Sequence, residues 1–309
     1  MEKGQVNYLI GMGGWEQEVL DGCFYPHPNL TSAGKLAYYA GFFETTEIRP
    51  TFWDESLRAD DVKPWVDAVA HARMFLFNVK LHALFTHKKT VARDVAKNTL
   101  GILRFLQGQQ KLGALLMQFP YEYTYTSSNR LHLARLAEIF RGFPVHVELR
   151  HDSWQTPSLR NFLAENFLFP VNADMPRVKR LMPFSPNVAG ETAYLRLHGR
   201  NEKGWLLDNF DVRYDYLYNT RELHELRRRL DALSVRSRQV IIICNNTGGG
   251  KAVATALQLT SMLRQDKPGM KPLQVPAAAY RTFPVLHDNT TPFENEGSLF
   301  GEVDYRAAM

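Results

Sequence analysis

The sequence predicts a single α/β domain, a (β/α)8 TIM barrel, with an extended C-terminal tail. The first observation is a series of eight short β-rich runs spread over residues 6–244. The second is that apolar residues at three-and-four spacing, typical of amphipathic helices, lie between most of these runs. Strands that alternate with helices form parallel βαβ units. Eight such units in roughly 240 residues favour one closed barrel over two domains.

Each predicted element is defined by a residue range. The strands are expected at 6–10, 45–49, 75–80, 114–118, 145–150, 170–174, 193–198 and 240–244. The helices are expected at 35–43, 64–72, 88–107, 129–140, 158–166, 220–233 and 251–263. The link 175–192 contains prolines and is the weakest repeat. Because periodicity ends near residue 265, we divide the chain into a barrel domain, 1–265, and an extended or partly disordered tail, 266–309.

The composition is that of a globular protein. The 309 residues are 45% hydrophobic and 22% charged, which excludes a disordered chain and a coiled coil. The apolar runs are too short to span a bilayer, and the first ten residues lack the apolar segment of a signal peptide. Two cysteines cannot form a disulfide framework, so we expect a cytoplasmic protein without a membrane partner. The net charge of +5 permits an anionic partner.

Polar and apolar residues alternate along most of the predicted strands. In the fifth strand His146, Glu148 and Arg150 alternate with apolar residues. Residues two apart on a strand face the same way, and the apolar face of a barrel strand packs against helices, so the polar face points to the barrel axis. The side chains expected there, or at a strand end beside it, are Glu47, Arg49, Lys80, His82, Gln118, Glu148, Arg150, Asp174, Arg196, His198, Asn245 and Asn246.

Two interpretations of this polar interior are open. It is either a structural network of ion pairs or an open pocket at the C-terminal end of the barrel, where barrel active sites lie. We favour the pocket because many strands contribute polar residues at the same level. A solvated site would tolerate Glu148→Gln with little loss of stability, whereas a buried ion pair that loses one partner costs several kcal/mol.

Charge at the strand ends favours an anionic ligand. Six basic residues are expected there against three acidic ones, Glu47, Glu148 and Asp174; the basic residues are Arg49, Lys80, Arg150, Arg196, Arg200 and Lys251. The planar guanidinium suits phosphate or carboxylate. No cofactor is predicted, and a divalent metal on converging histidines and carboxylates is a less favoured alternative because the neighbouring cations would repel it.

Loops after three strands add candidate contacts. The segment 245–251, rich in glycine, follows the eighth strand and precedes a helix, so Gly249 and Lys251 are candidates for phosphate binding. A flexible turn that caps the helix is the alternative. Trp15 follows the first strand and is a candidate to stack on a ring of the substrate; the alternative, at least as well supported, is that it covers the rim of the core. His151 lies just past the fifth strand and is a further candidate contact.

A set of short motifs carries a family resemblance. They include Ile10-Gly-Met-Gly-Gly-Trp15, Phe42-Phe-Glu-Thr-Thr-Glu47, Val147-Glu-Leu-Arg-His151 and Tyr194-Leu-Arg-Leu-His-Gly-Arg200, in that order along the chain. Together they resemble the DUF72 family, which includes the YecE-like proteins. The resemblance implies a TIM barrel similar to those of endonuclease IV and xylose isomerase, without a firmly assigned activity. Members often have Asn-Ser where this chain has Arg49-Pro50, and Asn-Asp in place of Asn245-Asn246, which makes the strand ends more basic.

Two hypotheses for function follow. The first is an enzyme, hydrolase or phosphodiesterase-like, that acts on an anionic, phosphate-bearing substrate. Glu148 or His198 would transfer the proton and Lys80 would stabilise developing negative charge. The alternative is a non-catalytic nucleic-acid-binding module. A protein partner that binds the tail segment 297–300 is a weaker hypothesis.

Overall fold

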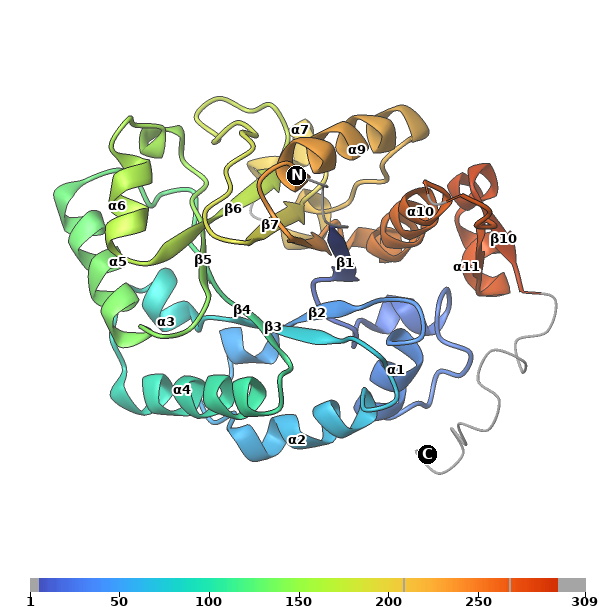
Figure 1. Ribbon diagram of the computed structural model, residues 1–309, viewed down its shortest axis with the longest axis horizontal. Coiled ribbons are helices and arrows are strands. Elements are labelled where there is room, and N and C mark those ends of the chain that lie inside the picture. The colour runs from blue at the N-terminus through green and yellow to red at the C-terminus, as the bar shows by residue number, and fades with distance from the viewer. Residues whose placement is uncertain (1–5, 208, 267, 294–309) are drawn as a thin grey trace.

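The computed structural model describes residues 6–207, 209–266 and 268–293. Eight parallel strands form a closed barrel in chain order, and helices surround it (Figure 1). The predicted single (β/α)8 barrel is therefore confirmed. The strands are β1 (Asn7–Met12), β2 (Thr45–Ile48), β3 (Leu76–Lys80), β4 (Leu112–Gln118), β5 (Val145–Glu148), β6 (Leu168–Asp174), β7 (Thr192–Leu197) and β8 (Gln239–Cys244).

The seven predicted helices are all present, with shifted ends. They are α1 (Ser32–Tyr39), α2 (Ala59–Ala68), α4 (Arg93–Gly108), α5 (Ser127–Ile139), α6 (Leu159–Glu165), α9 (Thr220–Ser234) and α10 (Lys251–Gln265). Side-chain caps set several starts: Asn219 and Glu222 form a capping box on α9, and Thr126 caps α5. Within the described ranges, no helix combines the length and apolarity needed to cross a membrane.

Short helical segments follow several strands and were not predicted. They are η1 (Glu18–Asp21), η2 (Pro50–Phe52), α3 (Ala83–Thr86), η3 (Asp152–Trp154), α7 (Glu202–Trp205), α8 (Phe210–Arg213) and η4 (Gly248–Gly250). One or two turns are too short to produce a helical period in the sequence. These segments lie at the C-terminal ends of the strands, which we call the mouth of the barrel, and they determine the shape of the candidate site.

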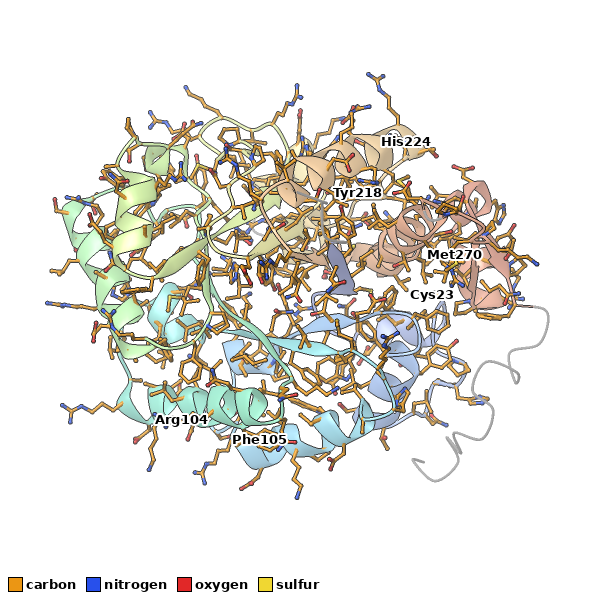
Figure 2. The ribbon with its side chains drawn as sticks, in the orientation of Figure 1. Cys23, Arg104, Phe105, Tyr218, His224 and Met270 are labelled. Atoms are coloured by element: carbon orange, nitrogen blue, oxygen red, sulfur yellow. The ribbon has the colours of Figure 1, made fainter. Side chains whose placement is uncertain are left out.

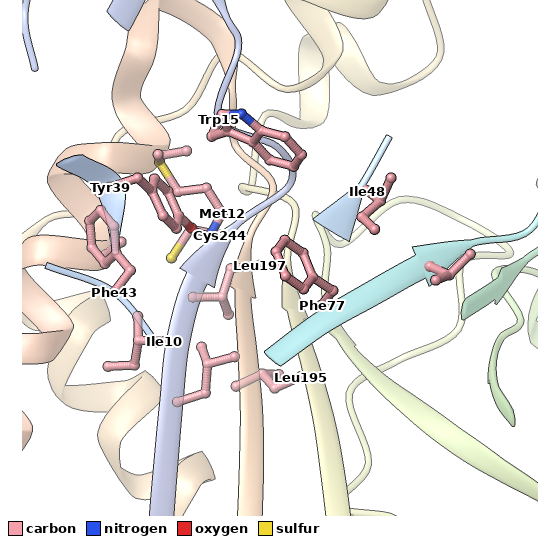
Figure 3. Close-up of a cluster of buried hydrophobic side chains, with 14 of the residues drawn as sticks. Ile10, Met12, Trp15, Tyr39, Phe43, Ile48, Phe77, Leu195, Leu197 and Cys244 are labelled. Carbon is pink, nitrogen blue, oxygen red and sulfur yellow. Dashed lines mark hydrogen bonds between the residues drawn. The ribbon is translucent and has the colours of Figure 1, made fainter. Parts of the chain in front are cut away.

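The apolar faces of the strands pack outward against the helices. Figure 3 shows Ile10 and Met12 of β1 beside Tyr39 of α1, and Leu195 and Leu197 of β7 in the same buried cluster. A second, smaller cluster lies inside the barrel toward the N-terminal ends of the strands and consists of Leu9, Ala114, Tyr194, Ile241 and Ile243. Side chains fill the centre of the ring of strands (Figure 2). The charged side chains of the interior, Glu47, Glu148 and Arg196, lie beyond this layer toward the C-terminal ends of the strands.

The predicted orientation of β6 is wrong. Val171 packs with the interior cluster, so Asn172 and Asp174 lie on the outer face of the strand. The link that follows β6 has no helix, and its main chain covers this face. Asn172 exchanges hydrogen bonds with the main chain of Asn187, at 2.8 and 2.9 Å. The main chain of an extended covering segment needs hydrogen-bond partners. The outer face of β6 is therefore polar, whereas the outer face of a barrel strand is usually apolar.

The expectation of an extended arm after residue 265 is also wrong over the described residues. This segment contains β9 (Leu273–Val275), α11 (Ala277–Thr282), η5 (Pro284–Asp288) and β10 (Thr290–Pro292), and β9 pairs with β10 in parallel. It packs beside α10 at the edge of the barrel (Figure 1), with Val275 and Leu286 fully buried. Elements of three to six residues have no detectable period. The predicted partner segment 297–300 lies outside the described residues.

Candidate anion-binding site

Arg196 of β7 joins two buried carboxylates across the barrel. Its Nε and Nη2 donate to the two oxygens of Glu47 on β2, both at 2.8 Å, and its Nη1 donates to Glu148 on β5 at 2.7 Å. All three residues are at most 2% exposed. A guanidinium that binds one carboxylate with both arms is the strongest form of this ion pair. We call Glu47, Glu148, Arg150, Arg196 and His198 the ionic network.

Arg150 and His198 complete the hydrogen bonds of Glu148. Arg150 Nε and His198 Nε2 both lie near Glu148 Oε1, at 2.7 and 3.1 Å. The amide of Asn245 lies 3.0 Å from His198 Nδ1 and 3.2 Å from Arg196 Nη2. Because a carboxylate only accepts and the Asn245 amide nitrogen only donates, His198 carries its proton on Nε2. Every polar atom of His198 is thus satisfied while the ring is neutral.

The protonation states of Glu148 and His198 follow from these contacts. Burial alone would raise the pKa of Glu148, but His198, Arg196 and Arg150 overcome this and hold it well below its usual range. Burial lowers the pKa of His198 to about 4, and Glu148 only partly opposes that shift. Both groups therefore hold one protonation state at neutral pH. The geometry favours a structural role for them, and the expectation of a solvated pocket at Glu148, which is 0% exposed, is wrong.

Lys80, at the end of β3, has no such partners. Among the residues that the structure describes, its ammonium group has no hydrogen-bond acceptor or carboxylate within contact distance, and it lies 3.7 Å from the centre of the Phe52 ring. Burial lowers the pKa of Lys80 to about 7, and the charges of Arg196, Arg150 and Arg49 add to that effect against Glu47. Lys80 as a residue is half-buried, and its ammonium group stands beside the ionic network without a partner of its own among the described residues.

Two arginines also keep unused donors. The guanidinium of Arg49 forms no hydrogen bond or ion pair with any described residue, and lies 5.8 Å from the rings of both Trp53 and Phe210. Arg150 Nη2 is buried without a partner. An unsatisfied buried donor costs about 1–3 kcal/mol. We call Lys80 Nζ, the Arg49 guanidinium and Arg150 Nη2 the free donors; they are the parts of the mouth suited to a negatively charged ligand.

Two cavities meet at Arg49. The larger, about 570 Å³, lies between the loop after β8 and α8; the smaller, about 250 Å³, lies between the loop after β1 and Trp53. Gly13 and Gly14 allow the β1 loop to approach the network: a Cβ on Gly13 would lie 2.5 Å from Asn245 Oδ1, and Gly14 has φ +103° with a Cβ position 2.8 Å from Arg49 Cδ. A side chain at either glycine would displace groups of the site.

The loop after β8 is less basic than the sequence suggested. Lys251 lies 2.5 Å from the carboxylate of Asp215, and Gly248 packs directly against the same residue. Gly249 has φ +58°, as a tight turn requires. Glu18 and Asp211 also line the larger cavity. These carboxylates oppose an anion at Gly249 and Lys251, so the geometry favours the alternative of a turn that caps α10.

Asp174 and Arg200 lie away from the free donors. On the outer face of β6, Asp174 binds both arms of Arg200, at 2.9 and 3.0 Å, together with Arg229 and the hydroxyl of Tyr218. Arg200 also lies 2.9 Å from Glu225 on α9. The prediction that Asp174 faces the barrel axis is therefore wrong, and Arg200, expected to hold an anion at the mouth, is paired with Asp174 instead. Four basic residues, Arg49, Lys80, Arg150 and Arg196, and two carboxylates, Glu47 and Glu148, remain at the mouth.

The other predicted contacts are buried and bonded locally. The Trp15 indole is 1% exposed and donates to Ser32 O. His82 and His151 cap α3 and η3 through their Nδ1 atoms. Gln118 bonds the carbonyl of Phe119, and Asn246 bonds Tyr216 O and Thr255. The predicted binding roles of these residues stay predictions.

Aromatic residues after β7 cover the ionic network and were not predicted. Trp205 and Tyr214 are buried; Arg150 Cζ lies 5.7 Å from the Trp205 ring, and Arg150 Nη1 donates to the Tyr214 hydroxyl at 3.1 Å. The Tyr214 ring lies 5.6 Å from that of His198. The sequence signal for this cover is the high number of aromatic residues between 205 and 218. Their spacing follows neither the helical nor the strand period, so it predicts no element.

The fold and the site define a (β/α)8 barrel with an ion-paired interior and unpaired cations at its mouth. The family model described as a protein of unknown function, DUF72, matches residues 9–279. The chain belongs to this family, as the sequence motifs indicated.

Named relatives agree with this membership. The UPF0759 protein YunF of Bacillus subtilis is 27% identical over 285 residues, which cover 86% of this chain and 98% of YunF. The crystal structure of a DUF72 family protein from Thermotoga maritima matches with a TM-score of 0.72 at 27% identity, over 83% of this chain and 99% of that one. One from Enterococcus faecalis matches with a TM-score of 0.73 at 25% identity, over 87% and 100%.

Replacement of Glu148 by glutamine tests the structural role of the ionic network. Arg196 and Arg150 would each lose a charged partner in a buried site, so we expect Glu148→Gln to lower the free energy of unfolding by about 3–5 kcal/mol. The measurement is urea denaturation at neutral pH. Glu191→Gln is the matched control, because Glu191 pairs with Arg238 at an exposed position and should change stability by less than about 1 kcal/mol. Equal, small effects of both variants would contradict the structural role.

Acid should destabilise the fold through its buried histidines. The pKa of His198 is lowered to about 4 from 6.5, so the unfolded chain binds this proton more readily, and stability present above pH 6.5 is lost as the pH falls toward 4. We expect a loss on the order of 3 kcal/mol from this group, measured as the urea midpoint across that range. His198→Gln should flatten the pH dependence; an unchanged slope in this variant would show that His198 does not contribute.

Proposed function

We propose that this protein is an enzyme that binds an anionic, phosphate-bearing substrate at the mouth of its barrel. The observation that carries the proposal is the set of free donors on Lys80, Arg49 and Arg150, next to carboxylates that are already paired with Arg196. An anion there would supply the missing acceptors without competing for bonds in the ionic network. Active sites of TIM barrels lie at this end of the strands.

Lys80 is the residue best suited to a chemical role. Its pKa of about 7 allows it to hold or release a proton near neutral pH. The reaction expected from the sequence is hydrolysis of a phosphate ester, with proton transfer by Glu148 or His198. Their complete sets of hydrogen bonds give that assignment no support, so hydrolysis remains a prediction and Lys80 is the first residue to test for chemistry.

Nucleic-acid binding is the second candidate, and one observation favours it. Trp53 and Phe210 are 58% and 50% exposed, and both rings lie 5.8 Å from the Arg49 guanidinium; exposed aromatic rings beside a cation are suited to stacking of bases. Glu18, Asp211 and Asp215 in the adjoining cavity oppose a polyanion. A single anionic group at the free donors therefore fits the charges better than a nucleic-acid strand.

Thermal unfolding with phosphate tests the anion site. At a tenfold excess over the dissociation constant, phosphate should stabilise the protein by about 1.4 kcal/mol, which corresponds to a rise in Tm of roughly 2 °C for a chain of this size. Arg49→Gln should remove this rise. Arg104→Gln, at an exposed position on α4 (Figure 2), should keep it.

Controls separate specific binding from salt effects. Sodium chloride at matched ionic strength corrects for screening, and the comparison of the two variants corrects for general stabilisation by phosphate. The same rise in Tm in wild type and Arg49→Gln would contradict the proposal. Stabilisation by a single-stranded oligonucleotide but not by phosphate, lost in Trp53→Ala, would favour the second candidate instead.

A further inference from the structure

Within the part of the chain that the structure describes, Lys80 lacks the acidic partner that some other lysines of this protein have. Lys35 lies 2.6 Å from Asp21 and Lys251 lies 2.5 Å from Asp215. Lys80, by contrast, lies over the face of Phe52 at 3.7 Å, and no carboxylate of the described residues pairs with it. Its position at the end of β3 places it at the mouth, where the residue is half-buried.

The charges that face Lys80 favour its neutral form. Burial lowers the pKa of Lys80, and the charges of Arg196, Arg150 and Arg49 lower it further. Glu47 acts in the opposite direction, but its carboxylate is already paired with Arg196. The other titratable neighbour is His87, whose pKa burial lowers to about 4, so it is neutral at pH 7. A lysine that is desolvated next to cationic groups is an activated nucleophile. A lowered pKa leaves part of the Lys80 side chains unprotonated near neutral pH, with a free electron pair on Nζ.

We infer that Lys80 forms an imine with an aldehyde or ketone that carries an anionic group. The inference rests on the proposed anion site and narrows its substrate to an anionic carbonyl compound. The free donors of Arg49 and Arg150 would bind the anionic group, which holds the carbonyl carbon beside the amine. A purely electrostatic role would need only the charge of Lys80, which arginine also provides, and this difference makes the inference testable.

The step balances without a further reactant. The electron pair of Lys80 Nζ adds to the carbonyl carbon, and the nitrogen transfers a proton through water to the carbonyl oxygen. The resulting carbinolamine loses its hydroxyl group together with the remaining proton on nitrogen as one water molecule; the C–O bond breaks and the C–N bond becomes C=N. No electron is gained or lost, so the reaction is a reversible condensation. The imine nitrogen, once protonated, withdraws electrons from the adjacent carbon, which is the use enzymes make of lysine imines.

Reductive trapping tests the inference. Glyoxylate and acetaldehyde are aldehydes with two carbons each, and only glyoxylate is anionic. Each is incubated with the full chain and cyanoborohydride at pH 7, and peptide mass analysis locates the modified lysines. We expect Lys80 to react with glyoxylate at least tenfold faster than the exposed Lys97. Acetaldehyde should show a smaller preference for Lys80, and inorganic phosphate should compete with glyoxylate.

Two variants complete the design. Lys80→Arg keeps the positive charge but cannot form an imine at neutral pH, so it should lose the selective label. Lys97→Arg should lose only the comparison label. Because Lys80 and Lys97 are compared within the unaltered protein, the result does not depend on whether a variant folds.

The outcomes distinguish this inference from the proposed function. Reaction of Lys80 with glyoxylate no faster than that of Lys97 would overturn the imine, whether or not phosphate raises Tm. Selective labelling of Lys80 that is equal for glyoxylate and acetaldehyde, without competition by phosphate, would overturn the anion site and leave a reactive lysine.

Discussion

The guanidinium of Arg196 is the interaction on which the arrangement at the mouth depends. It spans the barrel from β7 to Glu47 on β2 and Glu148 on β5, with three hydrogen bonds of 2.7–2.8 Å. Two carboxylates in a buried interior are tolerated only when they are paired and fully hydrogen-bonded. Arg196 satisfies this requirement for both and ties three separated strands together. Tyr194 below it donates to Glu47 at 3.0 Å, which joins the polar layer to the apolar layer.

The same pairing determines which charges remain for a ligand. Arg196 uses four of its five N–H donors on the two carboxylates and the Asn245 amide, so it has little left to offer an anion. The positive charge in excess lies on Lys80, Arg49 and part of Arg150, whose donors lack partners among the described residues. The cost of these unsatisfied groups is the expected trade between stability and function at a binding site. The residues that stabilise this end of the barrel are therefore different from the residues proposed to bind the ligand there.

The order of strands and the inward set on β2, β3, β5 and β7 could be predicted from the sequence, because two-residue alternation in a buried strand leaves little freedom of register. The error on β6 has a physical cause: the strand is covered by an extended segment, so Asp174 could be polar and still lie outside, paired with Arg200. Which inward residues are paired and which are free could not be predicted. The pairing depends on which side chains are long enough to meet across the barrel. It also depends on Tyr214, which binds Arg150 and lies in a segment whose sequence shows no helical or strand periodicity.

The measurement that tests this account most directly is a crystal structure of the protein with phosphate bound. The account predicts an anion within hydrogen-bond distance of Lys80 Nζ, the Arg49 guanidinium and Arg150 Nη2, while Arg196 keeps its bonds to Glu47 and Glu148. A phosphate bound instead to the loop of Gly249 and Lys251, or one that draws Arg196 away from its carboxylates, would contradict it.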